Sequence, residues 1–562
     1  MSGSGIDPAA PRTLSRRTLV AKGLQVAGGA ALIPAAGLAP AVARAARLRA
    51  STAQADPGTL TYAAEAGLPG LDPARWWNGF VWDGVEAIFD SILRVPTYEG
   101  KSLTPGLAGL PHVSRGGTLY TFKLRRGVMF HHGREMTADD VKFSLERLLS
   151  PELGSEGISL YNTLPIVGLP AVLHQKAKQV KGIKAVDRYT LTIQLEHPES
   201  VLPYVLSLPF ASVVPRDVVE RLGNKKFNLA PVGTGPFSVG GVDLAKGLTL
   251  TRFPKYWKPG TPKIQRVEWS FGLDPHLAVL RIQNGQLDLM QSQVPIGDVQ
   301  QLRSDPSLVK QLVIGPVNLT YYFTVNVKRK PLDDVRVRRA IAMAIDREKM
   351  ARVLKGLVKP ASGGLFSPLS PYYQPGLAPK YDPTAAKALL AQAGQANGFD
   401  LEILGQTETP FAEMVQTAQA DLKAIGINAK ARLVTGDVFV REAYVADPPA
   451  MTAYLWDLPF PHGSYFMDGA FTEAAVKAKC CNLSVYVNPT FERLKTAAHG
   501  TNNPAQLRSL YRSMDKLVVS DVAAIPAFYY ERVEFVGKRV QGYRTPATYT
   551  VVTFFRDYSL KA

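Results

Sequence analysis

Cysteine is almost absent from this sequence, which has only Cys480 and Cys481 among its 562 residues. Two cysteines cannot build a disulfide framework or a zinc site with four thiolate ligands. Because they are adjacent, they could form a disulfide with each other in an oxidising compartment, and two free thiols are the alternative. A catalytic thiol needs a neighbouring base, and the sequence offers none.

Motifs that identify enzymes and metal sites are missing as well. The sequence contains no H-E-x-x-H, no G-x-S-x-G and no G-x-G-x-x-G. The pair His131-His132 lies in a predicted turn, where adjacent imidazoles make a poor metal site without further ligands. We therefore expect both histidines to be structural and predict no enzyme, no metal site and no cofactor, with nickel or haem binding as the weaker alternative.

Negative charge is scarce, since 47 Asp and Glu face 65 Lys and Arg, for a formal net charge of +18. A basic balance can indicate nucleic acid or an anionic surface as a partner. No dense basic run interleaved with aromatic residues occurs, so we expect a solvated basic surface and no nucleic-acid partner. Arg336, Arg338 and Arg339 follow Asp333 and Asp334 at the start of a predicted helix, where they can pair with these acids.

Long apolar runs are missing everywhere except near the N-terminus. There, Arg16-Arg17 precedes a weakly apolar stretch without charge at 23–43, and A-x-A-like cleavage sites follow at 41–43 and 43–45. Residues 1–45 are therefore predicted to be a twin-arginine signal peptide, with an uncleaved anchor as the alternative. No cysteine lies near the cleavage sites, so we expect no lipoprotein. The mature protein is predicted to be periplasmic, and the twin-arginine translocase is its predicted partner during export.

What the sequence does contain is a regular alternation of strand and helix patterns. Thr137 and Asp140 form a capping box that predicts a helix start, and apolar spacing predicts another helix at 85–93. Strands are predicted at 59–64, 118–124, 188–195, 287–290, 321–327, 401–404 and 525–530. This alternation favours an α/β protein, with about three or four domain-sized units in a chain of this length.

Several segments taken together carry a resemblance to a known family. They are 120–133 with 137–144, 231–237, 284–288, 323–326 with 331–347, and Ile525-Pro526. In this order they resemble the extracytoplasmic solute-binding proteins of ABC importers, in the peptide/dipeptide/nickel-binding family, family 5. The resemblance covers essentially all of residues 57–562.

The resemblance implies an α/β architecture, the class II periplasmic-binding-protein fold, with two lobes joined by hinge strands and an extra domain on the first lobe. Lobe one is expected at 57–98, 212–315 and 524–562, the extra domain at 99–211, and lobe two at 316–523. Such a protein captures a small solute, here a peptide or a related molecule, in a cleft between the lobes. It works as a monomer and delivers the solute to an inner-membrane ABC permease.

The loop after the first predicted strand is expected to line this cleft. Loops at the carboxyl ends of α/β strands line such crevices, which makes Trp76, Trp77 and Asn78 candidate ligand contacts. The alternative is that the two tryptophans pack between lobe one and the extra domain. A weaker candidate from lobe two is Phe366.

A second candidate segment supplies Tyr454, Trp456, Asp457, Phe460 and His462. Family members often have Trp and then Asp-x-x-Asp-Pro here, and in peptide binders an aspartate of this region pairs with the ligand's α-ammonium. Asp457 keeps the position of the first acid, but Phe460 replaces the second. Either Asp457 alone anchors an amine, or the ligand has no ammonium group.

The function predicted from the sequence is therefore solute capture for an ABC importer, without catalysis. An exported hydrolase on the same scaffold and a sensory protein that presents its ligand to a receptor are the alternatives. Peptides, opine-like amino-acid derivatives, oligosaccharides and metal chelates all fit the resemblance, so the ligand stays open at this point.

Overall fold

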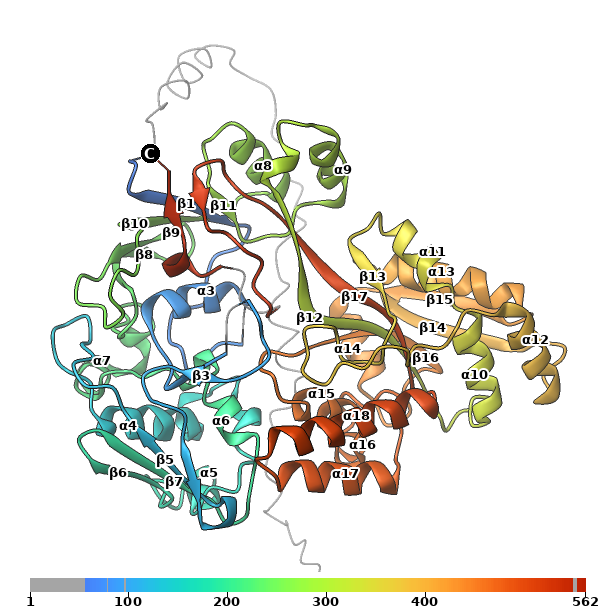
Figure 1. Ribbon diagram of the computed structural model, residues 1–562, viewed down its shortest axis with the longest axis horizontal. Coiled ribbons are helices and arrows are strands. Elements are labelled where there is room, and N and C mark those ends of the chain that lie inside the picture. The colour runs from blue at the N-terminus through green and yellow to red at the C-terminus, as the bar shows by residue number, and fades with distance from the viewer. Residues whose placement is uncertain (1–55, 78, 96–97, 549–552, 562) are drawn as a thin grey trace, which may run out of the picture.

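The computed structural model describes residues 56–77, 79–95, 98–548 and 553–561 (Figure 1). The predicted signal peptide at 1–45 and the candidate contact Asn78 lie outside these residues. The described chain has an α/β architecture with three main sheets, which confirms the predicted fold class. None of its helices is long and apolar enough to cross a membrane.

A five-stranded sheet with the order β11-β1-β10-β9-β8 forms the body that we call lobe one, at the upper left of Figure 1. Its strands are β1 (Thr59–Ala64), β8 (Phe237–Asp243), β9 (Gly247–Arg252), β10 (Arg266–Phe271) and β11 (Leu289–Met290). Strand β1 is parallel to both β10 and β11, so the carboxyl ends of these three strands meet at one edge. The helices of this body are α3 (Gly79–Ile88), α7 (Arg216–Phe227), α8 (Pro275–Gln283) and α9 (Ile296–Ser304).

A four-stranded antiparallel sheet, β4-β5-β7-β6, forms the extra domain at the lower left of Figure 1. Its elements are β4 (His112–Ser114), β5 (Leu119–Lys123), β6 (Ile183–Asp187), β7 (Thr190–Gln194), α4 (Ala138–Leu149), α5 (Leu169–Leu173) and α6 (Leu202–Val205). One continuous hydrophobic cluster joins this sheet to lobe one, with Tyr120 and Phe122 in the same core as Trp82 and Trp269. The extra domain and lobe one therefore share one core.

A six-stranded sheet, β13-β17-β12-β16-β14-β15, forms lobe two at the right of Figure 1. Its strands are β12 (Leu312–Val325), β13 (Val358–Pro360), β14 (Asp400–Gln406), β15 (Asn428–Val434), β16 (Met451–Asp457) and β17 (Ala524–Phe535). One hydrophobic cluster contains residues of α10 (Val335–Ala344), α11 (Arg347–Val353), α12 (Pro383–Gln392) and α13 (Phe411–Ala424). A second contains residues of α14 (Gly436–Ala443), α15 (Ser464–Phe471), α17 (Pro489–His499) and α18 (Pro504–Ser520). The short α16 (Glu473–Lys477) follows α15.

Two long antiparallel strands, β12 and β17, connect the lobes (Figure 1). Val533 and Phe535, at the end of β17, pack among lobe-one residues, whereas Ile525 and Phe528 pack in the core of lobe two. Both strands are longer than the expected 321–327 and 525–530. A pair of strands that belongs to both cores is the structural requirement for a hinge.

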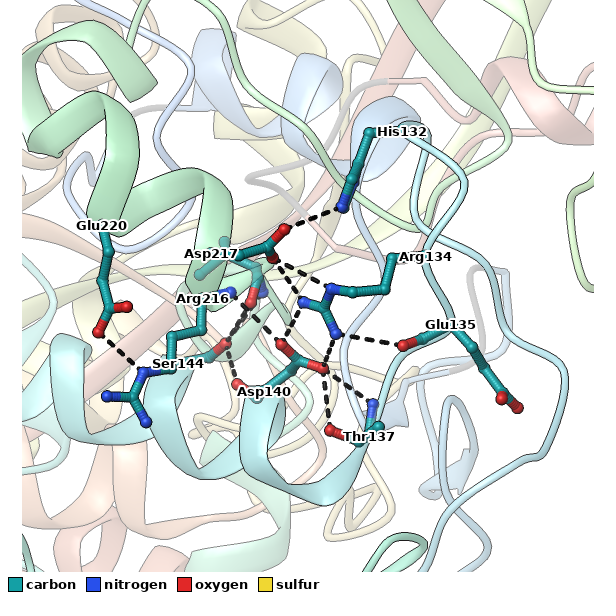
Figure 2. Close-up of polar contacts among 10 residues, drawn as sticks. His132, Arg134, Glu135, Thr137, Asp140, Ser144, Arg216, Asp217 and Glu220 are labelled. Carbon is teal, nitrogen blue, oxygen red and sulfur yellow. Dashed lines mark hydrogen bonds and ion pairs between the residues drawn. The ribbon is translucent and has the colours of Figure 1, made fainter.

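The segment around the predicted capping box ties α4 to α7 (Figure 2). The Thr137 and Asp140 side chains form the expected reciprocal box at the start of α4, which confirms that prediction. Arg134 then donates to Asp140 at 2.7 Å and to Asp217 at 2.7 Å, and His132 lies 3.3 Å from Asp217 (Figure 2). This stretch, which carries part of the family resemblance, therefore acts as a structural clamp.

Some local expectations from the sequence need correction. The helix expected at 85–93 spans Gly79–Ile88 instead, because Asp90 leaves the helix to accept hydrogen bonds from Tyr256 and Trp257.

Arg336 pairs with Asp334 at 2.6 Å as expected, but Arg338 donates to the carbonyl of Asp521 at 2.6 Å. Arg339 reaches the carbonyl of Ser520. Of the two alternatives for the cysteines, the structure has the disulfide between Cys480 and Cys481.

Candidate ligand-binding site

A groove lies where the carboxyl ends of parallel strands from the two lobes come together. Residues 293–296, which follow β11 of lobe one, form one wall, and residues 408–411, which follow β14 of lobe two, form the other. The connecting strands contribute Tyr321, Tyr530 and Val533 to its floor. Its volume of about 360 Å³ falls in the range of small-molecule sites, and carboxyl ends of strands are where α/β folds bind ligands.

The chemistry of the groove is apolar with a few acidic groups. Among its described lining residues, Val294, Tyr321, Phe411, Leu455, Tyr530 and Val533 supply apolar surface, and none is Lys or Arg. The Glu531 carboxylate lies 2.8 Å from the Lys359 ammonium, which neutralises it. Glu408 is exposed at the groove wall beside Thr409. A groove of this kind favours a ligand with an apolar body and a positively charged group.

Asp457 adds a further carboxylate at the end of β16. Side chains alternate along a strand, so Asp457 projects from the same face as Leu455, which lines the groove. Its backbone pairs with Leu319 of the connecting strand β12, and the residue is half-buried. Asp457 is therefore held at the junction of the two lobes. The family resemblance led us to expect an amine anchor at this residue.

A second, much smaller cavity lies farther along the same segment. Pro459 lines it from lobe two, and Trp82, Ser207 and Pro209 are among the residues that line it from lobe one and the extra domain. Its volume is about 40 Å³, room for little more than a water molecule or two. We call the two cavities together the interlobe crevice, with the larger groove as its open end and the small cavity, which is lined by residues of both lobes and the extra domain, as its packed end.

Aromatic side chains fill the packed end of this crevice. Trp77 of lobe one lies against Phe210, with ring centroids 5.4 Å apart, and stacks on Tyr465 of lobe two. Tyr465 in turn packs edge-on against Trp456 and Phe460. Phe460 is buried within the core shared by lobe one and the extra domain. Trp77, Trp456 and Phe460 are therefore connected through Tyr465. Trp77 also packs against the extra domain through Phe210, which is the alternative that the sequence left open.

Other candidates in the second segment have mainly packing roles. Trp456 stacks on Phe466 with ring planes 2° apart, and Tyr454 stacks on Phe439. His462 is fully buried, and its Nδ1 accepts from the Ser464 hydroxyl at 2.8 Å. Burial holds the pKa of His462 well below its usual value, so the ring stays neutral.

Two candidates do not reach the crevice. Phe366 is fully buried against Tyr372 and Phe466 in the second core of lobe two. Trp76 is half-buried and donates from Nε1 to the Asn228 side chain at 3.1 Å, within lobe one. Of the two neighbouring tryptophans, Trp76 therefore packs within lobe one, whereas Trp77 lies between the lobes.

The groove walls themselves were not among the residues expected from the sequence. Gln293, Glu408 and Thr409 come from loops that follow strands at 289–290 and 400–406, and Phe411 is the first residue of α13. Both strands were predicted at 287–290 and 401–404, so the carboxyl-end rule applied to them would have identified these loops.

The first histidine of the pair His131-His132 is hydrogen-bonded to the backbone: His131 Nδ1 accepts from Gly233 N at 3.2 Å, and Nε2 donates to Gly235 O at 3.0 Å.

Two α/β lobes, two connecting strands and a groove between strand ends define a two-lobed binding protein. The chain belongs to the bacterial extracellular solute-binding proteins of family 5. Its residues 102–478 match the middle region that defines this family. Members of this family are extracytoplasmic binding proteins and not enzymes, and this chain is a solute-binding protein of that kind.

Individual relatives cover nearly the whole chain. The chain is 28% identical to the di/tripeptide-binding protein 2 of Pseudomonas aeruginosa over 508 residues, 87% of this chain and 93% of the relative. It is 27% identical to the dipeptide-binding protein of Escherichia coli, over 86% of this chain and 92% of the relative. Its fold resembles the solved structure of HbpA2 from Haemophilus parasuis with a TM-score of 0.78, at 24% identity over 90% of this chain and 100% of the other.

Proposed function

We propose that this protein captures a short peptide, or a related solute with a free amine, in the interlobe groove and delivers it to the membrane permease of an ABC importer. The observation that carries the proposal is the position of Asp457 at the carboxyl end of β16, on the face that lines an apolar groove. A carboxylate in such a place forms a charge-assisted contact with an ammonium group. The names of the di/tripeptide- and dipeptide-binding relatives support the same ligand class.

In this proposal Asp457 anchors the ligand's amine, and Glu408 adds negative charge at the groove wall. Trp77, Tyr454, Trp456, Phe460 and His462 shape the packed end of the crevice, and Asn78, the next residue in the sequence after Trp77, is kept as a further candidate contact. We propose the domain limits 57–98, 212–315 and 524–562 for lobe one, 99–211 for the extra domain and 316–523 for lobe two. The sheets of lobe one and of the extra domain lie within these limits, whereas the lobe-two sheet also includes β17, which falls in the lobe-one limit 524–562, and the start of β12.

We also propose export by the twin-arginine route, with residues 1–45 as signal peptide, to a periplasmic location without a lipid anchor. The Arg16-Arg17 pair, the uncharged stretch that follows it and the A-x-A-like sites support this route. The exported protein is proposed to act as a monomer.

The ligand class is tested by purifying the exported protein without stripping it, denaturing it, and identifying the released molecules by mass spectrometry. Thermal-shift measurements with each candidate follow, because a ligand that binds only the native state raises its stability. Released peptides that raise the melting temperature would support the proposal. A released sugar or metal chelate would overturn the peptide assignment while leaving the family membership intact.

A further inference from the structure

The extra domain touches lobe two through buried polar contacts away from the open groove. Ser200 donates from its backbone N to the carbonyl of His499 at 2.9 Å, and from its hydroxyl to the carbonyl of Ala498 at 2.8 Å. Tyr120 of β5 donates to the Asn502 side chain at 3.0 Å. Ser200 and Tyr120 are both buried, so these contacts are shielded from water.

His499, the last residue of α17, joins the two bodies by an ionic bridge. Its Nδ1 lies 2.7 Å from Glu199 Oε2 of the extra domain, and its Nε2 lies 2.5 Å from Asp468 Oδ2 of lobe two. Each carboxylate requires a donor, so both ring nitrogens must carry a proton and the ring must be an imidazolium. These two carboxylates raise the pKa of His499 to about 10 against the opposing effect of burial.

The same bridge leads back to the segment that carries the amine anchor. Asp468 lies on α15, where Phe466 stacks on Trp456, the residue before Asp457. His462, between β16 and α15, donates from Nε2 to the Ser200 hydroxyl at 3.1 Å, because that hydroxyl already donates to Ala498. The extra domain therefore contacts the loop between β16 and α15 and, through the bridge, α15 itself, which together directly follow Asp457.

We propose that the extra domain forms the end wall of the ligand crevice, and that His499 is the positioning residue that holds this wall against lobe two. The small cavity at the packed end is lined by Ser207 and Pro209 of the extra domain and by Pro459 of lobe two. The contacts of Ser200, Tyr120 and His499 join the same two bodies. The part of this inference that concerns the ligand rests on the proposed function. The wall and its charged bridge are properties of the ligand-free protein.

The charged groups that face His499 come from two elements. Glu199 approaches from the extra domain, and its other oxygen accepts from Val201 N at 3.1 Å. Asp468 approaches from α15, and neutral His462 lies nearby. One turn earlier on α17, Lys495 and Glu492 pair with each other at 2.7 Å. With two facing carboxylates and no facing cation among the described residues, the imidazolium persists through the neutral pH range.

The first test needs no ligand. Histidine side chains are followed by NMR from pH 5 to 8.5, with the His499 signal assigned by its loss in His499→Gln. The inference predicts that this signal does not titrate in that range. It also predicts faster hydrogen exchange in the segment around Ser200 in both His499→Gln and Glu199→Gln. A midpoint near the ordinary value of about 6.5, or unchanged exchange in both variants, would overturn it.

The matched control is His276→Gln, because His276 forms a similar pair with Asp298 at 2.7 Å entirely within lobe one. Calorimetry with trialanine provides the second test. We expect His499→Gln to weaken trialanine binding about tenfold, the effect of losing a hydrogen bond to a charged group, and His276→Gln to leave it unchanged. Equal affinities in wild type and His499→Gln would contradict the wall. If wild type fails to bind trialanine, the peptide assignment fails, and the titration and exchange experiments still decide the inference.

Discussion

Trp77 of lobe one stacks on Tyr465 of lobe two, with ring centroids 6.2 Å apart and ring planes 12° apart. The two rings come from segments nearly four hundred positions apart in the sequence. Tyr465 is the second residue of α15, and Trp77 precedes α3. This contact makes the packed end of the crevice an interlobe junction, because Tyr465 packs against the core of lobe one and the extra domain as well as against the second core of lobe two.

A double-mutant cycle on this pair measures that junction. Trp77→Ala and Tyr465→Ala should couple by about 0.5–1.5 kcal/mol in the free energy of unfolding, as aromatic pairs do beyond their buried area. Urea unfolding followed by fluorescence checks the value. The control cycle combines Trp77→Ala with Tyr373→Ala, because Tyr373 packs against Tyr529 within lobe two and should show no coupling. Additive effects in the first cycle would argue against the stack.

A buried ion pair should dominate the stability of the joint between lobe one and the extra domain. Arg147 of α4 donates to Asp72 Oδ1 at 2.9 Å, and both side chains are buried. Arg147→Met should cost about 3–5 kcal/mol, because it leaves an unpaired buried carboxylate. The double variant Arg147→Met/Asp72→Leu should recover much of that loss. Thermal unfolding of wild type and the two variants measures both effects, and an unaffected melting temperature in Arg147→Met would contradict the prediction.

His131 should make the protein sensitive to mild acid. Its neutral ring accepts from Gly233 N and donates to Gly235 O, and burial lowers its pKa to about 4. The unfolded chain, with an ordinary pKa of about 6.5, binds the proton first. The stabilisation from His131 is therefore complete above about pH 6.5 and is lost as the pH falls toward 4. Urea unfolding at pH 7.5 and 5 should show a steeper loss of stability in wild type than in His131→Gln, and equal losses would refute this assignment.

Gly235 should tolerate no side chain. A Cβ there would lie 2.4 Å from the backbone carbon of Ile88, which cannot move without displacing α3. Gly235→Ala is expected to cost about 1–3 kcal/mol, as overpacking does. Gly241→Ala is the matched control, because a Cβ at Gly241 meets nothing within 4 Å. Equal melting temperatures for the two variants would show that the turn has more room than the structure gives it.

Much of the fold could be predicted because local signals and tertiary structure agree. The capping box of Thr137 and Asp140 and the strand at 59–64 both lie where their patterns placed them. The connecting strands were predicted too short, since Gly315 and Pro316 interrupt the strand pattern of β12. Only pairing with β17 keeps that stretch extended, and such long-range pairing leaves no local signal.

The candidate site depends on burial, which local patterns do not encode. The pattern at 453–456 predicted the end of β16, but Phe366, which was expected near a ligand, lies in a core. The groove walls around Gln293 and Glu408 come from different lobes. Their proximity depends on how β12 and β17 set the two sheets against each other, which no single segment encodes.

The central claim is that Asp457 anchors the free amine of a peptide in the groove. Calorimetry with trialanine and with N-acetylated trialanine tests it most directly, using wild type, Asp457→Asn and the surface control Asp305→Asn. Wild type and Asp305→Asn should bind the free peptide alike, and either acetylation or Asp457→Asn should weaken binding about 10–100-fold, the effect of losing a charge-assisted contact. Equal binding of the acetylated and free peptides, or no binding of either by wild type, would contradict the account.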